Sequence, residues 1–318
     1  MGWKASDIPD QSGRVAVVTG GNGGLGLETS RQLAAHGAVV VIGARNLDKA
    51  ETARRDIQST VPGASIEIRA LDLGSLASIA AFAAEVKAAH PRIDLLFNNA
   101  GIMAVKEGTT VDGFETQFGT NLLGPFALTL QLLPALLAAQ APRVVSTTST
   151  ARWRAGKYDL SNPHMHGCYD PWDAYGMSKR ADLQFAFELN HRLQGRGLRA
   201  FAADPGFSKT DLQTSSVRAN NGFMQRFWKR MTAIMGQSAA MGALPQLRAG
   251  TDPAAVGGTL YAPRWITFGA PVVRGVGKKI DDPAQEARLW ELSECETGLK
   301  IDSVAGQDAA TGAAMMGE

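Results

Sequence analysis

The sequence is poor in cysteine and close to neutral in charge. Two cysteines in 318 residues, Cys168 and Cys295, allow at most one disulfide and form no CxxC pair, which excludes a disulfide-stapled secreted scaffold and a paired-cysteine zinc or redox site. A formal net charge of +2 with 19% charged residues gives no reason to expect nucleic acid as a partner. These absences favour an ordinary globular protein in a reducing, cytoplasmic compartment.

Uninterrupted apolar segments are also absent. The first residues, MGWKASDIPDQSGR, contain no apolar run of the signal-peptide type. The most membrane-like window, residues 122–141, is broken by glycine, proline and glutamine, among them Gly124 and Pro134, and it lies between two strand candidates. We therefore predict a buried or interface helix there rather than a membrane span.

The sequence does contain short β-branched runs that alternate with longer runs rich in Ala and Leu. This alternation is typical of βαβ units in a parallel sheet covered on both faces. Strands are expected at residues 14–20, 38–44, 65–71, 93–99, 143–149 and 198–204, and helices at 25–36, 47–60, 76–89, 113–137 and 172–193. The pattern predicts an α/β fold with a doubly wound, Rossmann-type parallel sheet.

The alternation ends after Ala203. Residues 275–280, GVGKKI, suggest a last strand, and residues 282–294 suggest a helix capped by Asp282 with Pro283 in its first position. We predict a single domain over residues 1–303, with a helical substrate-lid segment at about 211–250 and a flexible tail at 304–318.

A glycine-rich stretch follows the first expected strand. Thr19, Gly20, Gly24 and Gly26 give the pattern TGxxxGxG directly before a helix. A strand, a glycine turn and a helix N-terminus form a phosphate site, because backbone N–H groups point outward and no Cβ atom blocks a close approach. A glycine turn alone is equally compatible with a tight connection between packed elements.

Six further motifs follow in order along the chain. They are Asp72 and Leu73 in LDL, NNAG at 98–101, Asn121 in TNLLG, Ser149 in RVVSTTSTA, Tyr175 and Lys179 in YGMSK, and PGFSKT at 205–210. With the glycine turn, these motifs resemble the short-chain dehydrogenase/reductase family over about residues 12–212. Within that family, ARNLDKA, YGMSK and LWELSE are most similar to the retinol-dehydrogenase-like NADP-dependent reductases.

The resemblance implies a set of site residues. As catalytic residues it implies Asn121, Ser149, Tyr175 and Lys179. As residues that bind the cofactor it implies Gly20, Asn22, Gly24, Leu25, Gly26, Asp72, Leu73, Asn99, Ala100, Gly101, Tyr175, Lys179, Pro205, Gly206 and Thr210. Thr210 is also compatible with a residue that simply starts a turn.

Tyr175 and Lys179 are four residues apart on an expected helix, so both project from one face. A free phenol, with a pKa of about 10, is a poor base near neutrality, and a nearby ammonium lowers that pKa. Tyr175 is then able to donate a proton during ketone reduction and to take it back during alcohol oxidation. On its own, a YxxxK pair is more typical of a solvated helix face.

Ser149, at the carboxyl end of a strand, is expected to hydrogen-bond the substrate oxygen and to stabilise the charge that develops there. By resemblance, Lys179 also binds the nicotinamide ribose, and Asn121 holds a water that connects Lys179 to solvent. Asn121 is also compatible with a simpler role, in which its amide satisfies backbone groups.

The end of the second strand bears on the choice of cofactor. An acidic residue there would accept hydrogen bonds from an adenosine ribose and repel a 2'-phosphate, but the sequence has Ala44 followed by Arg45. A guanidinium suits bidentate phosphate contact, so we predict NADP(H) as the cofactor, with Arg45 as a binding residue. The alternative is that Arg45 only decorates the surface.

Two other clusters offer candidate residues for a substrate pocket and for a metal site. Residues 223–241, rich in Met and aromatic side chains, are compatible either with a lid over an apolar pocket or with a core or oligomer contact. His164, His166 and Cys168 in HMHGC supply three possible metal ligands, but hydride chemistry needs no metal, and we expect none.

The sequence therefore predicts an NADPH-dependent carbonyl reductase, or alcohol dehydrogenase in reverse, acting on a hydrophobic ketone, aldehyde or secondary alcohol. Two alternatives stay open: another reaction on the same fold (epimerase, dehydratase or C=C reductase), and a dinucleotide-sensing protein without catalysis. By resemblance a homodimer or homotetramer is expected. Asp204, before the PG turn, departs from the commoner pattern and alters the charge expected near the nicotinamide.

Overall fold

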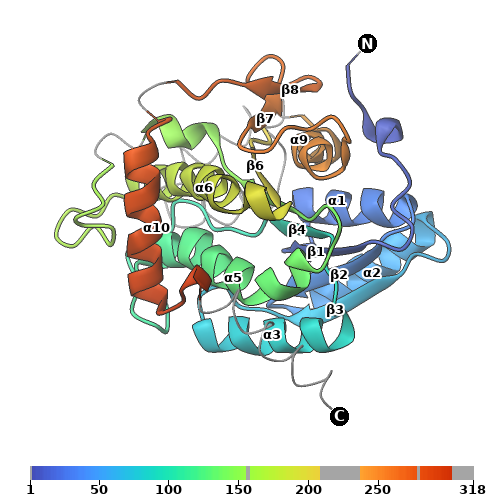
Figure 1. Ribbon diagram of the computed structural model, residues 1–318, viewed down its shortest axis with the longest axis horizontal. Helices are drawn as coiled ribbons and strands as arrows, with labels where there is room; N and C mark the ends of the chain where they lie inside the picture. The colour runs from blue at the N-terminus through green and yellow to red at the C-terminus, as the bar shows by residue number, and fades with distance from the viewer. Residues whose placement is uncertain (1, 155–157, 208–236, 278–279, 303–318) are drawn as a thin grey trace, which may run out of the picture.

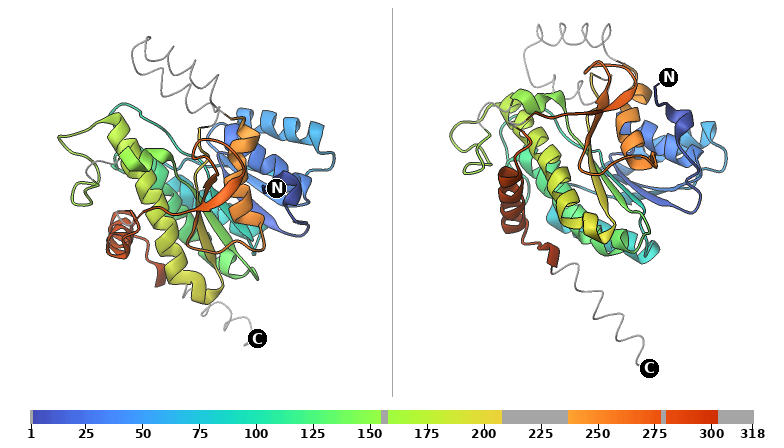
Figure 2. Two further views of the ribbon diagram at one scale, coloured as in Figure 1. Left: turned by 90° about the horizontal axis from the view of Figure 1, so that it is seen from above. Right: turned by 45° about the horizontal axis from the view of Figure 1, so that its top comes forward.

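The computed structural model describes residues 2–154, 158–207, 237–277 and 280–302. A central sheet is covered by helices on both faces, so the molecule has three layers (Figures 1 and 2). The strands of this sheet are the short β-branched runs of the sequence, and the Ala- and Leu-rich runs form the helices between them.

The strands and helices have the following bounds. The strands are β1 (Val15–Thr19), β2 (Val39–Ala44), β3 (Ile66–Ala70), β4 (Leu95–Asn98), β5 (Arg143–Thr147), β6 (Arg199–Ala203), β7 (Leu260–Pro263) and β8 (Pro271–Arg274). The helices are α1 (Gly24–Ala35), α2 (Leu47–Thr60), α3 (Leu76–Ala89), α4 (Thr116–Phe118), α5 (Gly124–Leu137), α6 (Pro171–Leu193), α9 (Ala239–Thr251) and α10 (Pro283–Thr297), with a π-helical turn η2 (Gly119–Leu123) between α4 and α5 and 3-10 turns η1 (Ala5–Asp7), η3 (Thr150–Arg154) and η4 (Gln194–Arg196).

The eight strands pair in the order β3-β2-β1-β4-β5-β6-β7-β8. All pairs from β3 to β7 are parallel, and β8 adds an antiparallel edge to β7. The direction of winding reverses between β1 and β4, which is the switch point where doubly wound sheets bind ligands. The predicted α/β fold with a doubly wound parallel sheet is confirmed.

Each face of the sheet has its own apolar core. Helices α1, α2 and α9 cover one face, where Leu33, Ile57 and Leu247 are fully buried. Helices α3, α5 and α6 cover the other face, and α10 packs on the outside of α6 (Figure 1), where Trp290 lies 5.0 Å from Phe126, centroid to centroid. Because both faces are covered, the central strands are apolar on both sides, as the continuous runs of the sequence indicated.

Most predicted elements lie within a few residues of the observed ones, but one predicted strand is wrong. The predicted helix at 113–137 begins only at Thr116, because Gly113 (φ 90°) closes a turn first, and the π-helical turn interrupts it. The strand predicted at GVGKKI does not form at 275–277. The side chains of Val276 and Ile280 are buried instead in a small apolar cluster. Two apolar residues in a short polar segment resemble the alternating pattern of a strand. Among the described residues the last strand is β8, directly before that segment.

Residues 116–137 form, within the described part of the chain, the one helical stretch long and apolar enough to cross a membrane. In its most apolar window 78% of the residues are buried inside the fold. The side chains that made this segment look membrane-like, among them Leu128, Leu132 and Leu136, lie in the core between the sheet and the neighbouring helices.

Candidate active site

The carboxyl ends of β1 to β6 lie at one edge of the sheet, because the six strands are parallel. Most motifs singled out in the sequence follow these strand ends, while Asn121 lies on η2 and the YGMSK motif on α6. The glycine turn follows β1, Arg45 follows β2, Asp72 follows β3, NNAG ends β4, Ser149 follows β5, and the Pro205–Gly206 turn follows β6. The fold therefore brings residues nearly two hundred positions apart to one edge.

The glycine turn leaves no space for side chains. Gly20 and Gly24 have φ values of 66° and 52°, and a Cβ atom on Gly26 would lie 2.3 Å from the Gly20 carbonyl oxygen. Gly23 is the N-cap of α1 and supplies no side-chain cap for the first amides of the helix. Asn22 lies in this turn and Leu25 in the first turn of α1, and both are half-buried. The cradle suits a pyrophosphate, whose charge the exposed amides and helix dipole favour.

The NNAG loop is tied to the glycine turn through Thr19. The backbone amides of Asn99 and Ala100 donate to Thr19 Oγ1 at 3.0 and 2.9 Å, and Asn99 Nδ2 donates to the Thr19 carbonyl at 2.9 Å. A Cβ atom on Gly20 would lie only 3.0 Å from the Ala100 Cβ. The ends of β1 and β4 thus form one rigid wall at the switch point.

The other predicted cofactor-binding residues differ in solvent exposure. Arg45 is exposed and, among the described residues, makes no ion pair, while Asn46 is used as the N-cap of α2. Asp72 is half-buried, and its Oδ1 accepts from the Gly74 amide at 2.9 Å. Leu73 is buried against α5 and belongs to the core. The guanidinium of Arg45 is therefore open to a phosphate from outside the chain.

Tyr175 and Lys179 lie one turn apart on α6 and are 6% and 5% exposed. Lys179 Nζ lies 5.9 Å from the centroid of the Tyr175 ring and donates to the Thr147 carbonyl at 3.0 Å and to Asp182 Oδ2 at 2.8 Å. The sequence predicted Tyr175 and Lys179 as neighbours, and the structure brings them together. It did not predict Asp182, although the i, i+3 spacing from Lys179 was a readable signal.

Burial raises the pKa of the Tyr175 phenol above its usual value. The Lys179 ammonium and a hydrogen bond with the Ser149 hydroxyl lower this pKa, whereas Asp182 and Asp204 raise it. The net direction is upward, which differs from the sequence-based expectation that the ammonium makes the phenol acidic. The main physical reason is that the phenol itself is buried, and the cation that would lower its pKa is paired with a carboxylate.

Asn121 lies in the π-helical turn and is 1% exposed. Its Oδ1 accepts from the Ile102 amide at 2.8 Å, and its Nδ2 donates to the Ile102 carbonyl at 3.0 Å and to Ser178 Oγ at 2.9 Å. The side chain thus has the backbone-satisfying role that the sequence left open, and it fixes the loop after β4 to α6. Gly101 lies between Asn121 and Lys179, since a Cβ atom there would be 3.0 Å from Asn121 Oδ1 and 3.3 Å from Lys179 Nζ.

A buried ion pair joins the turns after β5 and β6. Arg152, in the 3-10 turn behind Ser149, donates its amide to the Ser149 carbonyl at 3.0 Å and its guanidinium to Asp204. Asp204 Oδ1 accepts from the Gly206 amide at 2.9 Å, and Gly206 has a φ of 63°. The sequence flagged Asp204 as a departure from the family pattern but did not identify Arg152, which pairs with it only in the folded chain.

Some predictions fall on residues that the structure does not describe. Thr210 and residues 211–236 of the predicted lid segment lie outside the described residues. In the rest of that segment, α9 begins at Ala239 and packs against α1, and Gln237 Nε2 donates to the Pro205 carbonyl at 2.8 Å.

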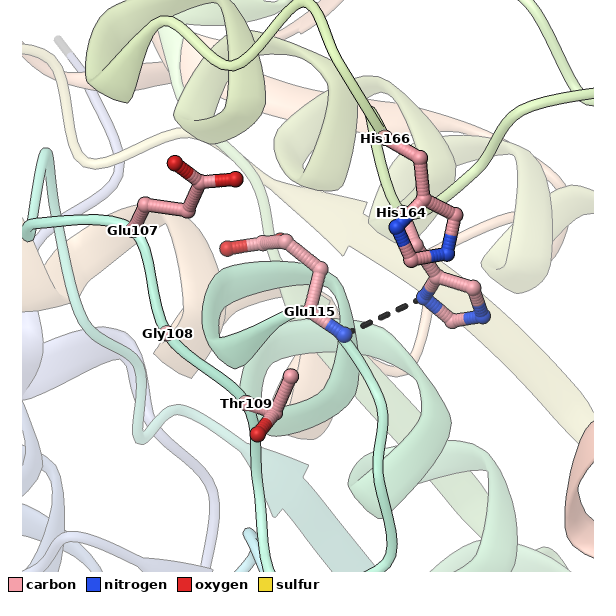
Figure 3. Close-up of a pocket in the computed structure, with 6 residues that line it drawn as sticks. All are labelled: Glu107, Gly108, Thr109, Glu115, His164 and His166. Atoms are coloured by element: carbon pink, nitrogen blue, oxygen red, sulfur yellow. Dashed lines mark hydrogen bonds between the residues drawn. The ribbon is translucent and has the colours of Figure 1, made fainter.

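The HMHGC segment lines a separate polar pocket with Glu107, Thr109 and Glu115 (Figure 3). His164 Nδ1 accepts from the Glu115 amide at 3.1 Å, the dashed line of Figure 3, and the Glu115 carboxylate caps the start of α4. Burial raises the pKa of that carboxyl. Among the described residues no group of three His, Cys, Asp or Glu side chains is placed to hold a metal ion, and none of the predicted catalytic residues lines this pocket.

Comparison with known proteins gives a consistent result. Residues 14–221 match the family model of the short chain dehydrogenases. A short-chain dehydrogenase/reductase from Armillaria gallica is 36% identical over 304 residues, which covers 92% of this chain and 93% of that protein. Human retinol dehydrogenase 13 is 34% identical over 298 residues, which covers 93% and 88%.

Solved structures agree with the sequence relatives. A crystal structure of an uncharacterised protein from Mycobacterium paratuberculosis has a TM-score of 0.78 at 38% identity and covers 95% of this chain and 99% of its own. A metagenomic short-chain oxidoreductase in complex with NADP has a TM-score of 0.52 at 30% identity, with 62% of this chain and 83% of its own covered.

Proposed function

The chain belongs to the short-chain dehydrogenase/reductase family of oxidoreductases, which act on CH–OH groups, and we propose that it is an NADP(H)-dependent carbonyl reductase, working in reverse as an alcohol dehydrogenase. The observation that supports this proposal most strongly is the assembly of Ser149, Tyr175 and Lys179 beside the glycine turn at one sheet edge. A protein that only senses a dinucleotide has no need of that set.

The chain's own residues account for the proton chemistry. NADPH, when bound, supplies a hydride for the carbonyl carbon of the substrate. The Ser149 hydroxyl hydrogen-bonds the carbonyl oxygen, and Tyr175 transfers its proton to that oxygen as the carbon is reduced, leaving a phenolate. Lys179 stabilises the phenolate through its ammonium until a solvent proton restores the phenol. The products are the alcohol and the oxidised cofactor.

The end of β2 supports the proposed preference for NADP(H). Arg45 is exposed there, and Ala44 provides no carboxylate to repel a 2'-phosphate. One family neighbour of known structure binds NADP, which supports the same choice for this chain.

The substrate that we propose is a hydrophobic ketone, aldehyde or secondary alcohol. Retinol dehydrogenase 13 is named for an apolar alcohol, and it is among the relatives that match this chain over most of its length. We also propose a cytoplasmic location and a homo-oligomer, with neither nucleic acid nor a membrane span involved.

The test is a substrate panel in which NADPH absorbance and product are measured together. Aldehydes, aromatic ketones, steroids and retinoids are each incubated with enzyme and NADPH. We expect one alcohol formed for each NADPH oxidised, with bulky apolar carbonyls ahead of small polar ones. Reduction of a C=C bond with the carbonyl intact, or epimerised product without net NADPH oxidation, would instead assign one of the alternative reactions.

A further inference from the structure

We propose that Asp182, together with Asp204, neutralises the positive charge around Tyr175 and keeps its hydroxyl protonated, so that at neutral pH the site is set to give a proton to a carbonyl rather than to take one from an alcohol. This inference deepens the proposed function and rests on it. Neither carboxylate has a role in the set of residues that the sequence assigned.

The argument begins with a charge count. One cation lies beside the phenol, the Lys179 ammonium, 5.9 Å from the centroid of the Tyr175 ring. A second, the Arg152 guanidinium, is the partner of Asp204, whose charge also acts on Tyr175. Each has its own buried carboxylate, since Lys179 donates to Asp182 Oδ2 at 2.8 Å and Arg152 donates to Asp204. Asp182 and Asp204 are only 3% and 1% exposed, so water screens neither pair. With a neutral phenol the site is balanced, and a phenolate would add an uncompensated negative charge.

The groups that act on the Tyr175 phenol belong to three structural elements. Lys179 and Asp182 lie on its own helix, Ser149 lies on the turn after β5, and Asp204 lies on the turn after β6. Lys179 and Ser149 favour the phenolate, and burial and the two carboxylates oppose it. The balance favours the phenol, because burial is the largest of these effects.

Other groups surround the two pairs. The buried Tyr158 phenol lies within range of Asp182, with the Arg180 guanidinium 4.5 Å from the centroid of its ring and Glu286 also in range. Burial raises the Tyr158 pKa, so this phenol adds no charge. On the other cation, the Trp153 ring lies 5.3 Å from the Arg152 guanidinium carbon and likewise adds none. Asp182 and Asp204 are thus the carboxylates that oppose ionisation of Tyr175.

The two carboxylates also act on the cation. Burial lowers the pKa of the Lys179 ammonium, but Asp182, Tyr175 and, to a smaller extent, Asp204 together outweigh it, so the pKa of Lys179 is raised. Asp182 therefore secures the charge of the ammonium while reducing its pull on the phenol. Asp182 is therefore a positioning residue. It acts on the proton of Tyr175 through its ion pair with Lys179 and through the direct electrostatic effect of its carboxylate on the phenol.

The experiment follows the Tyr175 proton directly in the cofactor-free protein. Tyrosine labelled with carbon-13 at Cζ gives an NMR signal for each of the four tyrosines, and Tyr175→Phe assigns one of them. The wild type is compared with Asp204→Asn and Asp182→Asn, and with the control Asp173→Asn, whose side chain is 50% exposed near the start of α6. Circular dichroism and thermal melting confirm that each variant is folded.

We expect Asp204→Asn and Asp182→Asn to move the Tyr175 titration midpoint downward by on the order of one pH unit, and the control to leave it in place. Asp204→Asn is the cleaner variant, because the guanidinium that it leaves unpaired stays charged throughout the titration. Equal Tyr175 midpoints in wild type, control and Asp204→Asn would overturn the proposal.

A kinetic arm separates this proposal from the proposed function. In the oxidation direction, the rise of kcat/KM with pH should shift to lower pH in both variants and coincide with wild type in the control. A shifted Tyr175 midpoint in a protein that turns over no carbonyl would retain the charge argument and reject the enzyme. An active carbonyl reductase with an unshifted Tyr175 midpoint would retain the proposed function and reject the charge argument.

Discussion

Gly26 shows how a single missing side chain defines the cofactor cradle. The position a Cβ would occupy lies 2.3 Å from the Gly20 carbonyl oxygen and 2.6 Å from Asn99 Nδ2, so both the glycine turn and the NNAG loop approach it. Neither neighbour is free to move, because both belong to the wall at the ends of β1 and β4. The requirement for glycine here is thus one of space, since only the bare backbone fits between these two strand ends.

From this contact we predict that Gly26→Ala weakens NADPH binding about 5- to 150-fold, since displacing the turn by one methyl group costs roughly 1 to 3 kcal/mol. Fluorescence titration of NADPH measures it. Gly195→Ala is the matched control, because a Cβ there meets nothing within 4 Å. Equal affinities for the two variants would show that the turn is not a phosphate cradle.

Arg45 is the residue on which the choice between NADPH and NADH depends. We predict that Arg45→Glu lowers the ratio of NADPH to NADH affinity by about 100-fold, because a charge-assisted contact of roughly 1.5–3 kcal/mol is replaced by repulsion. Both dissociation constants are measured by titration.

The control for Arg45 is Arg55→Glu on α2. The Arg55 side chain is 76% exposed, and its ion pair runs to Glu51 on the same helix. The control makes the same charge change without touching the end of β2. A ratio that falls equally in both variants would mean that overall charge, and not a 2'-phosphate contact, sets the preference.

Among the elements, those with strong periodic patterns were predictable from the sequence. Helices α2 and α3 have the predicted bounds, and α10 begins at its predicted cap, where Asp282 accepts from the amides of Ala284 and Gln285. Strands β7 and β8 were not found. Each has four residues and a proline at one end, so neither is long enough to show an alternating pattern, and their pairing is specified by tertiary contacts.

Helix α10 carries a carboxyl group whose pKa the fold changes. Burial, and then the charges of Asp281 and Glu188, raise the pKa of Glu286 from 4.5 to about 7. A raised pKa in the folded state means that the folded protein binds the proton more tightly. Its contribution to stability is therefore fully present below about pH 4.5 and is lost as the pH rises through 7.

We predict that Glu286→Gln reduces the fall in the free energy of unfolding across that window and stabilises the protein at pH 8 by about 1 to 2 kcal/mol, which allows for partial solvent screening. Urea unfolding at several pH values measures this. Glu291→Gln, on an exposed position of the same helix, is the control. A pH dependence identical in both variants would place the titrating group elsewhere; Asp182, whose pKa burial raises to about 6, is one such group.

Taken as a whole, the site was predictable to the extent that its residues follow strand ends. The order of the motifs and the parallel sheet predicted that Ser149, Tyr175 and the glycine turn lie at one edge. The pairing of Arg152 with Asp204 was not predictable, since 52 residues separate them and only the β5–β6 pairing brings their turns together. The upward direction of the Tyr175 pKa was not predictable either, because it arises mainly from burial of the phenol in the folded chain.

The expected homo-oligomer stays a prediction. Helix α10 packs on α6, with Trp290 stacked 6.1 Å from Phe185, centroid to centroid. The part of α5 and α6 that α10 covers is therefore already used within the subunit. A second copy has to contact α10 there or use another surface.

Cofactor binding should stabilise the whole domain, because the cradle uses the ends of six strands. At a concentration of NADPH one hundred times its dissociation constant, the free energy of unfolding is expected to rise by about 2.7 kcal/mol. Thermal melting with and without cofactor measures it, and NADH at the same concentration should raise the melting temperature less. A melting temperature that responds to neither nucleotide would mean that the cradle is not used.

The most direct test of the account is turnover by Tyr175→Phe, measured beside its affinity for NADPH. The account predicts that NADPH still binds within a few-fold of wild type, while kcat for ketone reduction falls by roughly 10²- to 10⁴-fold, because one phenolic proton is missing from an otherwise intact site. A variant that binds NADPH and reduces the ketone at the wild-type rate would contradict the central claim.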